Sequence, residues 1–290
     1  MSRQVAVVVG ATSGIGKATA LRLSRNGTRI LAIGRSPERS IRLMKKLALD
    51  DDVAAIDMST RQGWAGAAEW VRARTDHIDV LINAAGVMHP TRQTTPEGFE
   101  INFTVHHLAP FALTSRLLPL LRLGGVVDGP AGRTLPRVVN VNSAGHHMSM
   151  AGHANPVLDF EDLQSGRDYN PFLAYSRSKL ANLLFTFELA RRYGDELAVV
   201  AVHPGVVRTD IGRNFPRLQV AVAQVLAISP ETAARDVVGL ATGTLAANGR
   251  YYDRARPALS SPPSRDPVAA SRLWAATEEM CGEFAIPNQA

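Results

Sequence analysis

Short apolar runs alternate along the chain with longer segments in which apolar residues recur every three or four positions. The run Val5–Val9 is apolar throughout and mostly β-branched, as expected for a parallel strand buried on both faces. Further strands are predicted at residues 29–33, 53–56, 78–82, 137–143, 197–202 and 250–252. Helical patterns separate these runs, which predicts a Rossmann-type, doubly wound α/β fold with a parallel sheet of about seven strands. No repeat or linker divides the chain, so we expect a single domain over residues 1–290.

Helix starts are marked by a capping residue followed by proline. Such signals precede predicted helices at 36–49, 95–123 and 229–247, and a C-terminal helix beginning at residue 266. A further helix is expected around residues 64–72. Pro110 and Pro119 fall inside the long helix at 95–123, where they are expected to bend it.

The most informative helical stretch runs from Tyr175 to Tyr193, where apolar residues follow the i, i+3, i+4, i+7 spacing of a half-buried helix. Tyr175 and Lys179 are four residues apart, which puts both side chains on one helix face. A nearby ammonium favours the phenolate and lowers a phenol pKa that starts near about 10. The pair therefore suggests a proton donor, although an exposed tyrosine and lysine at the start of a helix would show the same spacing.

A glycine turn at residues 10–16 follows the first predicted strand directly and leads into a helix that begins at Gly14. Glycines allow a tight turn and a close backbone approach, and the helix N-terminus can bind a pyrophosphate. Arg35 follows the second strand, where an NAD-preferring site usually has an acidic residue. Arg35 therefore favours NADP(H), and the alternative is an ordinary surface arginine.

Composition narrows the class of protein. The 290 residues are 46% hydrophobic and 20% charged, which is typical of a globular protein with a large core. The single cysteine, Cys281, excludes an internal disulfide and favours a reducing compartment. No stretch reaches the length of a membrane span, so we expect a cytoplasmic protein without a membrane anchor.

Charge and histidine content exclude two further kinds of site. The net charge of +6 comes from scattered arginines that are not interleaved with aromatics, which argues against nucleic acid but favours anionic ligands. His146, His147 and His153 lack a nearby acidic or cysteine cluster of recognised spacing, so no metal is predicted.

Several of these motifs occur together in a recognisable order. They are the glycine turn, Asn83-Ala84-Ala85-Gly86, Ser143, Tyr175 with Lys179, and Pro204-Gly205. In order and approximate spacing the chain resembles the short-chain dehydrogenase/reductase family over essentially its whole length. It is most similar to the branch of retinol dehydrogenases, protochlorophyllide reductases and WW-domain oxidoreductases. The residues that suggest this branch are Gly98-Phe99-Glu100, Leu113-Thr114, residues 175–182 and Leu273-Trp274. That branch often carries an N-terminal membrane segment, for which the first apolar run here is too short.

The resemblance implies a role for each matching residue. Tyr175 would be the acid/base, Lys179 would lower its pKa and hold the nicotinamide ribose, and Ser143 would hydrogen-bond the substrate oxygen. An NADP(H) site is implied whose residues would be Gly10, Thr12, Ser13, Gly14, Ile15, Gly16, Arg35, Asp57, Met58, Asn83, Ala84, Ala85, Gly86, Tyr175, Lys179, Pro204, Gly205, Val207 and Thr209. Within it, Asp57 and Met58 would contact adenine, and Thr209 would lie near the nicotinamide carboxamide.

One position departs from the family pattern. Where the family has asparagine in a segment like V-N-H-L-G, this chain has Val105-His106-His107-Leu108-Ala109. The family asparagine is thought to hold a water that relays protons from the lysine, so His106 puts that relay in question. His106 itself can shuttle protons, Asn102 one turn earlier can hold the water, or His106 is only a packing residue.

The sequence thus predicts an NADP(H)-dependent oxidoreductase acting on a carbonyl/alcohol pair, with a lipophilic ketone or aldehyde as substrate. Two alternatives stay open: the same fold and cofactor used for a cyclisation, elimination or epimerisation, and a non-catalytic nucleotide-binding regulator. Substrate loops are expected at 144–174 and 206–228. A homodimer and a monomer are both compatible with the sequence.

Overall fold

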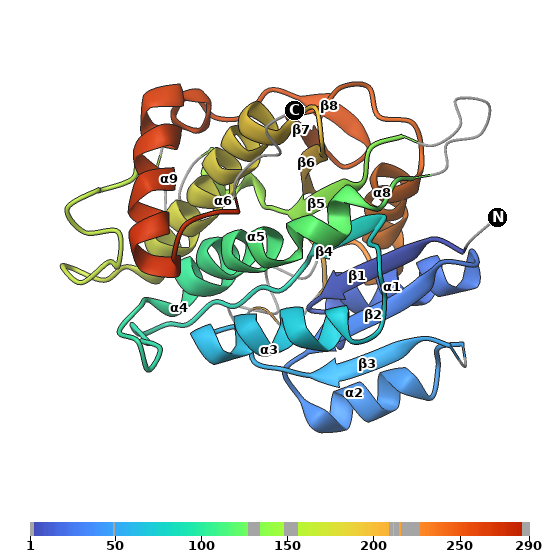
Figure 1. The fold of residues 1–290 in the computed structure, drawn as a ribbon. Coiled ribbons are helices and arrows are strands. Elements are labelled where there is room, and N and C mark those ends of the chain that lie inside the picture. The colour runs from blue at the N-terminus through green and yellow to red at the C-terminus, as the bar shows by residue number, and fades with distance from the viewer. Residues whose placement is uncertain are drawn as a thin grey trace.

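The computed structural model describes residues 3–48, 50–126, 134–147, 156–208, 211, 215 and 227–285. The described residues form one eight-stranded sheet in the order β3-β2-β1-β4-β5-β6-β7-β8 (Figure 1). Strands β1 to β7 are parallel, and β8 pairs antiparallel with β7 at the edge. The predicted doubly wound α/β class is therefore confirmed.

The strands are β1 Val5–Val9, β2 Arg29–Gly34, β3 Asp52–Ala55, β4 Val80–Asn83, β5 Arg137–Val141, β6 Ala198–His203, β7 Arg250–Asp253 and β8 Arg256–Ala258. Seven of them match predicted strands within three residues at each end. The prediction of about seven strands was one short because β8 has only three residues, all exposed, and contains Pro257. Such an edge strand has no apolar run to reveal it. The strand order reverses between β1 and β4, which places a ligand crevice at the carboxyl ends of these two strands.

The helices of the described chain are α1 Gly14–Arg25, α2 Pro37–Met44, α3 Arg61–Arg72, α4 Ile101–Phe103, the π-helix η1 Thr104–Leu108, α5 Ala109–Arg122, the short 3₁₀ turns η3 Ala144–His146 and η5 Pro262–Arg265, α6 Pro171–Tyr193, α8 Pro230–Thr242 and α9 Pro267–Cys281. Helices α1, α2 and α8 cover one face of the sheet, and α3, α5, α6 and α9 cover the other (Figure 1). The predicted helices at 36–49 and 229–247 were about five residues too long at their C-terminal ends. The spacing of apolar residues alone does not mark the residue at which a helix ends.

The long helix begins at Ile101, six residues later than predicted. Thr95 opens a tight turn instead, in which Gly98 N–H donates to the Thr95 carbonyl at 2.9 Å and Gly98 has a φ of +84°. The Glu100 side chain caps the helix, since its Oε2 accepts from Phe103 N–H at 2.8 Å. Thr95-Pro96-Glu97 resembles a helix start, but the glycine that follows closes a turn.

The π-helix η1 has a cause in the sequence. Pro110 has no N–H, so it cannot donate to the carbonyl of His106 four residues earlier, as an α-helix would require. Around this position the hydrogen bond from Ala109 N–H goes to Thr104 O, five residues back. The irregular turn that results carries His106 at its centre.

Helix α6 is the longest described helix and lies across the sheet (Figure 1). Leu180, Leu183 and Leu184 are fully buried, as the helical spacing predicted. Each buried leucine contributes about 1.5–3 kcal/mol, so packing anchors the helix that carries Tyr175 and Lys179. In the described part of the chain, no helix combines the length and the apolar character needed to cross a bilayer.

Candidate active site

The glycine turn packs too closely for any residue with a side chain at its first position. Gly10 has a φ of +81°, and a Cβ there would lie 2.6 Å from the main-chain nitrogen of Ala85. A Cβ at Gly16 would overlap the carbonyl of Gly10, and one at Gly34 would overlap the Thr12 side chain. The predicted turn at 10–16 is thus tied to the end of β2 and to the loop after β4.

The start of helix α1 opens toward the carboxyl edge of the sheet. Ser13 is its N-cap, yet the Ser13 side chain makes no hydrogen bond to the first turn of the helix. N–H groups at the first turn of a helix carry partial positive charge and bind anions. This cradle of glycines and helix N–H groups fits the pyrophosphate of a dinucleotide.

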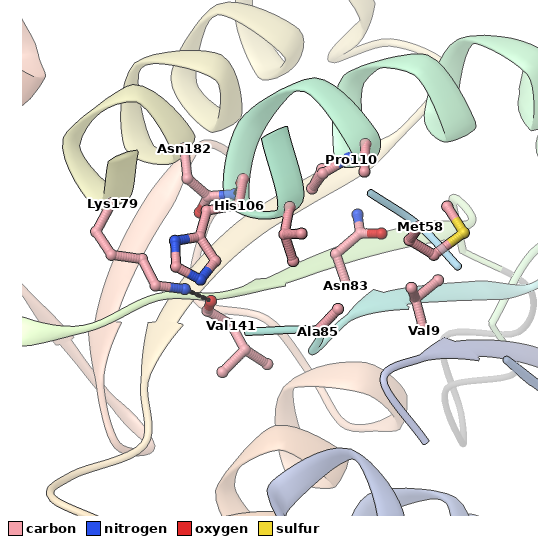
Figure 2. A pocket seen from close by; sticks show the side chains of 11 residues that line it. Val9, Met58, Asn83, Ala85, His106, Pro110, Val141, Lys179 and Asn182 are labelled. Carbon is pink, nitrogen blue, oxygen red and sulfur yellow. Dashed lines mark hydrogen bonds between the residues drawn. The ribbon is translucent and has the colours of Figure 1, made fainter. Parts of the chain in front are cut away.

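The residues expected at the adenosine end follow β2 and β3. Arg35 is exposed, and no carboxylate of the described chain forms an ion pair with it. Asp57 is exposed, and its Oδ1 accepts from Ser59 N–H at 3.0 Å. The side chain of Met58 is buried and faces the internal cavity beside Asn83 (Figure 2). The contact of Met58 with adenine stays a prediction.

The loop Asn83-Ala84-Ala85-Gly86 continues β4 beside the glycine turn. Ala84 N–H donates to the carbonyl of Val9 at 3.0 Å, and Asn83 Nδ2 donates to Asn140 Oδ1 at 2.8 Å. These bonds hold the loop against β1 and β5. The structure therefore brings the first two cofactor motifs together at the predicted edge.

Ser143, Tyr175 and Lys179 meet at the carboxyl end of β5. Ser143 caps η3, where its Oγ accepts from Gly145 N–H at 3.2 Å, and it also hydrogen-bonds the Tyr175 hydroxyl. Lys179 Nζ donates to the carbonyl of Val141 at 3.0 Å (Figure 2) and lies 5.9 Å from the centroid of the Tyr175 ring. Tyr175 is in the second turn of α6 and only 7% exposed, which excludes an exposed pair at a helix start.

Burial governs the acidity of this pair. Desolvation lowers the pKa of Lys179 to about 7, because an ammonium loses its hydration there. Burial raises the pKa of Tyr175 above its ordinary value, and the hydrogen bond with Ser143 opposes that rise. The expectation that Lys179 lowers the pKa of Tyr175 stays a prediction.

His106 is a neutral imidazole with both ring nitrogens bonded to the protein. Val87 N–H donates to Nε2 at 3.1 Å, so Nδ1 carries the proton and donates to Ser178 Oγ at 2.7 Å. Ser178 Oγ in turn donates to the carbonyl of Tyr175 at 2.6 Å. Burial, and secondarily the nearby Lys179, lowers the pKa of His106 well below its ordinary range. This geometry favours the packing interpretation of His106 over a proton shuttle.

A small cavity of about 10 Å³ lies under Lys179 and His106, which is room for about one water molecule. Asn83 and Asn182 also line it (Figure 2). Asn102 does not line the cavity. Its Nδ2 donates to Glu100 Oε1 at 2.6 Å instead. Asn102 is therefore not placed to hold a water for Lys179.

Two asparagines that the sequence analysis passed over belong to the site. Asn182 Nδ2 donates to the carbonyl of His106 at 2.8 Å, and its Oδ1 accepts from Asn142 Nδ2 at 2.7 Å. Both are buried, at 2% and 4% exposure. The signal that could have revealed Asn182 is an amide one turn after Lys179 in an otherwise apolar stretch, since buried amides need partners.

The segment after β6 completes the described site. Pro204 is buried, and Gly205 has a φ of +90°. Arg208 N–H donates to Ile228 O at 3.0 Å, and Val207 and Ile228 form an isolated bridge, so the two ends of the predicted loop 206–228 lie together. Thr209, residues 148–155 and most of 209–226 lie outside the described residues.

The histidines near Ser143 are held by protein contacts. His146 Nδ1 donates to Ser143 O at 2.6 Å, and its ring packs 4.1 Å from that of His147 and 4.8 Å from that of Tyr251. Among the described residues no group of three histidine, cysteine or acidic side chains is arranged to hold a metal. His153 lies outside the described residues.

Comparison with known proteins identifies the family. The family profile described as short chain dehydrogenase matches residues 4–155. Human retinol dehydrogenase 13 is 36% identical, with 95% of this chain and 84% of that protein covered. Human retinol dehydrogenase 12 is 34% identical, with 96% and 86% covered. The chain belongs to the short-chain dehydrogenase family of oxidoreductases, in its retinol dehydrogenase-like branch, which confirms the resemblance found in the sequence.

Solved structures agree on the fold. An uncharacterized protein from Mycobacterium paratuberculosis superposes with a TM-score of 0.76 at 30% identity, covering 98% of this chain and 96% of its own. The NADP complex of Pseudomonas aeruginosa RhlG superposes with a TM-score of 0.66 at 22% identity, covering 91% and 97%. The second likeness is too distant in sequence to show more than the shared fold.

Proposed function

We propose that this protein is an NADP(H)-dependent oxidoreductase that transfers a hydride between the nicotinamide and a carbonyl/alcohol pair, with a lipophilic ketone or aldehyde as substrate. The observation that carries the proposal is the meeting of Ser143, Tyr175 and Lys179 beside the glycine cradle. The similarity to proteins named as dehydrogenases of retinol supports a substrate of this kind.

The cofactor would be held along the carboxyl edge of the sheet. The glycine turn and the N-terminus of α1 would bind the pyrophosphate, and Arg35 would bind the 2′-phosphate that distinguishes NADP(H). The remaining predicted contacts of residues 57–58, 83–86, 204–209, Tyr175 and Lys179 are part of the same proposal. When bound, the nicotinamide supplies or accepts the hydride.

Residues of the chain itself would donate and accept the proton that accompanies hydride transfer. Ser143 Oγ orients the substrate oxygen, and Tyr175, already hydrogen-bonded to Ser143, donates its proton to that oxygen in the reducing direction. In the oxidising direction Tyr175 takes the proton back. Lys179, whose pKa is about 7, can gain or lose a proton near neutrality and so sets the charge beside Tyr175. The burial of both side chains keeps bulk water away from the transfer.

The Tyr175→Phe variant tests the assignment. It keeps the ring that packs at right angles to His106, 5.4 Å between centroids, and removes only the hydroxyl. Turnover of a carbonyl substrate is expected to fall by about 10²- to 10⁴-fold, while NADPH still binds. Tyr193→Phe, on the same helix and remote from Ser143, is the matched control and should keep its turnover. Normal turnover in Tyr175→Phe would remove the assignment of this residue as acid/base.

The two alternatives are less well supported. In the sequence the non-redox alternative rests on His106 and the long loop at 144–174, and the regulator alternative rests on His106. Both ring nitrogens of His106 are bonded to Val87 and Ser178. Product formation at one NADPH oxidised per substrate separates the oxidoreductase from a non-redox enzyme and from a regulator. The lone cysteine Cys281 supports a further proposal, that the protein acts in the reducing cytoplasm, which cell fractionation can test.

A further inference from the structure

Pro110 creates a hydrogen-bonding deficit beside the candidate active site. In an α-helix the carbonyl of His106 would accept from the N–H of residue 110, and proline has none. His106 is 1% exposed, so bulk water cannot reach this carbonyl in place of the missing donor. A buried carbonyl that loses a helical donor is stabilised by a donor from another element.

Asn182 supplies that donor from helix α6. Its Nδ2 donates to the carbonyl of His106 at 2.8 Å, and Figure 2 shows the two residues side by side at the cavity. Asn182 lies three residues after Lys179, near the same helix face, so the bond fixes the distance between α6 and the irregular turn η1.

The other end of the Asn182 amide reaches the strand that carries Ser143. Asn142 Nδ2 donates to Asn182 Oδ1 at 2.7 Å and to the carbonyl of Lys179 at 3.0 Å. Asn142 Oδ1 accepts from the main-chain N–H of Ser143 at 2.8 Å. We call these two side chains, Asn142 and Asn182, the asparagine bridge. It joins main-chain atoms of Ser143, Lys179 and His106, which come from three different elements.

We propose that Asn182 is a positioning residue, which sets Lys179 and Ser143 relative to the turn at His106 and supplies to the His106 carbonyl the donor that Pro110 cannot give. The inference rests on the proposed function for its effect on turnover. Through Asn142 the asparagine bridge ends on main-chain atoms of Ser143 and Lys179, which are proposed to act on the substrate, so loosening the bridge displaces these two residues without removing either side chain. A displacement of about 1 Å at a reacting group can lower a rate about 100-fold.

A double-mutant cycle on Asn182 and Pro110 tests the proposal. Asn182→Ala removes the donor, and kcat is expected to fall about 10- to 100-fold with little change in the Kd of NADPH. Pro110→Ala gives residue 110 an N–H that can reach the His106 carbonyl. The loss in kcat caused by Asn182→Ala should therefore be several-fold smaller in the Pro110→Ala background than in the wild type. If Asn182→Ala does not fold, Asn182→Ser enters the same cycle.

Asn248 provides a matched control at the opposite edge of the sheet. Its Oδ1 accepts from Val199 N–H at 2.7 Å and its Nδ2 donates to Leu197 O at 2.7 Å, so Asn248→Ala also loses two part-buried side-chain bonds to the main chain. This control is expected to lower Tm and leave kcat unchanged. The proposal is overturned if Asn182→Ala also lowers only Tm, or if its loss in kcat is equal in both backgrounds.

Tm measurements on the variants of the same cycle test the role of Asn182 independently of the proposed function. Tm can be measured without substrate or cofactor. The decrease in Tm caused by Asn182→Ala should be smaller in the Pro110→Ala background, whereas the decrease caused by Asn248→Ala should be the same in both backgrounds. If wild-type protein turns over no carbonyl substrate, the proposed function fails while the Tm coupling still reports on the bridge. Equal Tm losses in both backgrounds would overturn the role of Pro110 even in an active enzyme.

Discussion

Gly10→Ala is the substitution whose cost can be worked most directly from the structure. Gly10 has a φ of +81°, and an L-residue in that region costs about 1–2 kcal/mol. The added Cβ would lie 2.6 Å from Ala85 N, 2.7 Å from Ala85 Cα and 2.8 Å from the Ala84 carbonyl carbon. All three are main-chain atoms that cannot rotate away, and overpacking of this kind costs about 1–3 kcal/mol. The total expected loss is about 2–5 kcal/mol in the free energy of unfolding.

Comparison with Gly27→Ala separates the cost of steric overlap at Gly10 from the cost of the positive φ. Gly27 has a φ of +90°, but a Cβ there would meet no atom within 4 Å. It should therefore lose only the backbone cost of about 1–2 kcal/mol. Urea denaturation measures both losses, and titration by NADPH fluorescence measures cofactor affinity. Gly10→Ala should be the less stable and should bind NADPH more weakly, because it displaces the loop at Ala85. Equal stability of the two variants with wild-type NADPH affinity would refute the crowding argument.

Three further predictions concern charge. Lys179→Met should flatten the dependence of Tm on pH, since the folded pKa of Lys179 is lowered from 10.5 to about 7 and the unfolded chain binds the extra proton between these values. Wild-type stability should accordingly gain from this group as pH rises from about 7 to 10.5, and an unchanged slope in the variant would contradict the lowered pKa. Arg35→Asp should weaken NADPH about 10- to 100-fold more than NADH, and equal losses would show that Arg35 does not bind the 2′-phosphate. His106→Asn should lower the free energy of unfolding by about 1–3 kcal/mol, because Val87 N–H loses its acceptor, without moving the pH profile of kcat. A shifted profile would restore the relay interpretation.

Local patterns in the sequence were enough to predict the sheet and the proximity of Tyr175 to Lys179. The run Val5–Val9 and the glycine turn are contiguous, so strand, turn and helix follow from neighbouring residues. Tyr175 and Lys179 are four residues apart, and helical geometry alone puts them on one face. These inferences need no knowledge of distant contacts.

Features that depend on long-range contacts were missed. Asn182 and Asn142 are 40 residues apart, and neither is unusual until folding puts their amides together. The burial that raises the pKa of Tyr175 also depends on other elements and does not follow from the spacing of Tyr175 and Lys179. The start of the long helix at Ile101 depends on the Glu100 side chain as a cap, which competes with an equally plausible signal at Thr95.

The antiparallel edge strand β8 has a consequence for self-association. A sheet whose last strand exposes free N–H and C=O groups can recruit a second chain and grow across molecules. Here β8 covers the outer edge of β7, is itself only three residues long, and carries Arg256 and Pro257. Proline offers no donor and arginine resists burial against another strand, so this edge blocks continuation of the sheet. A dimer of this protein is therefore not expected to pair through β8, and this edge of the sheet is protected from aggregation.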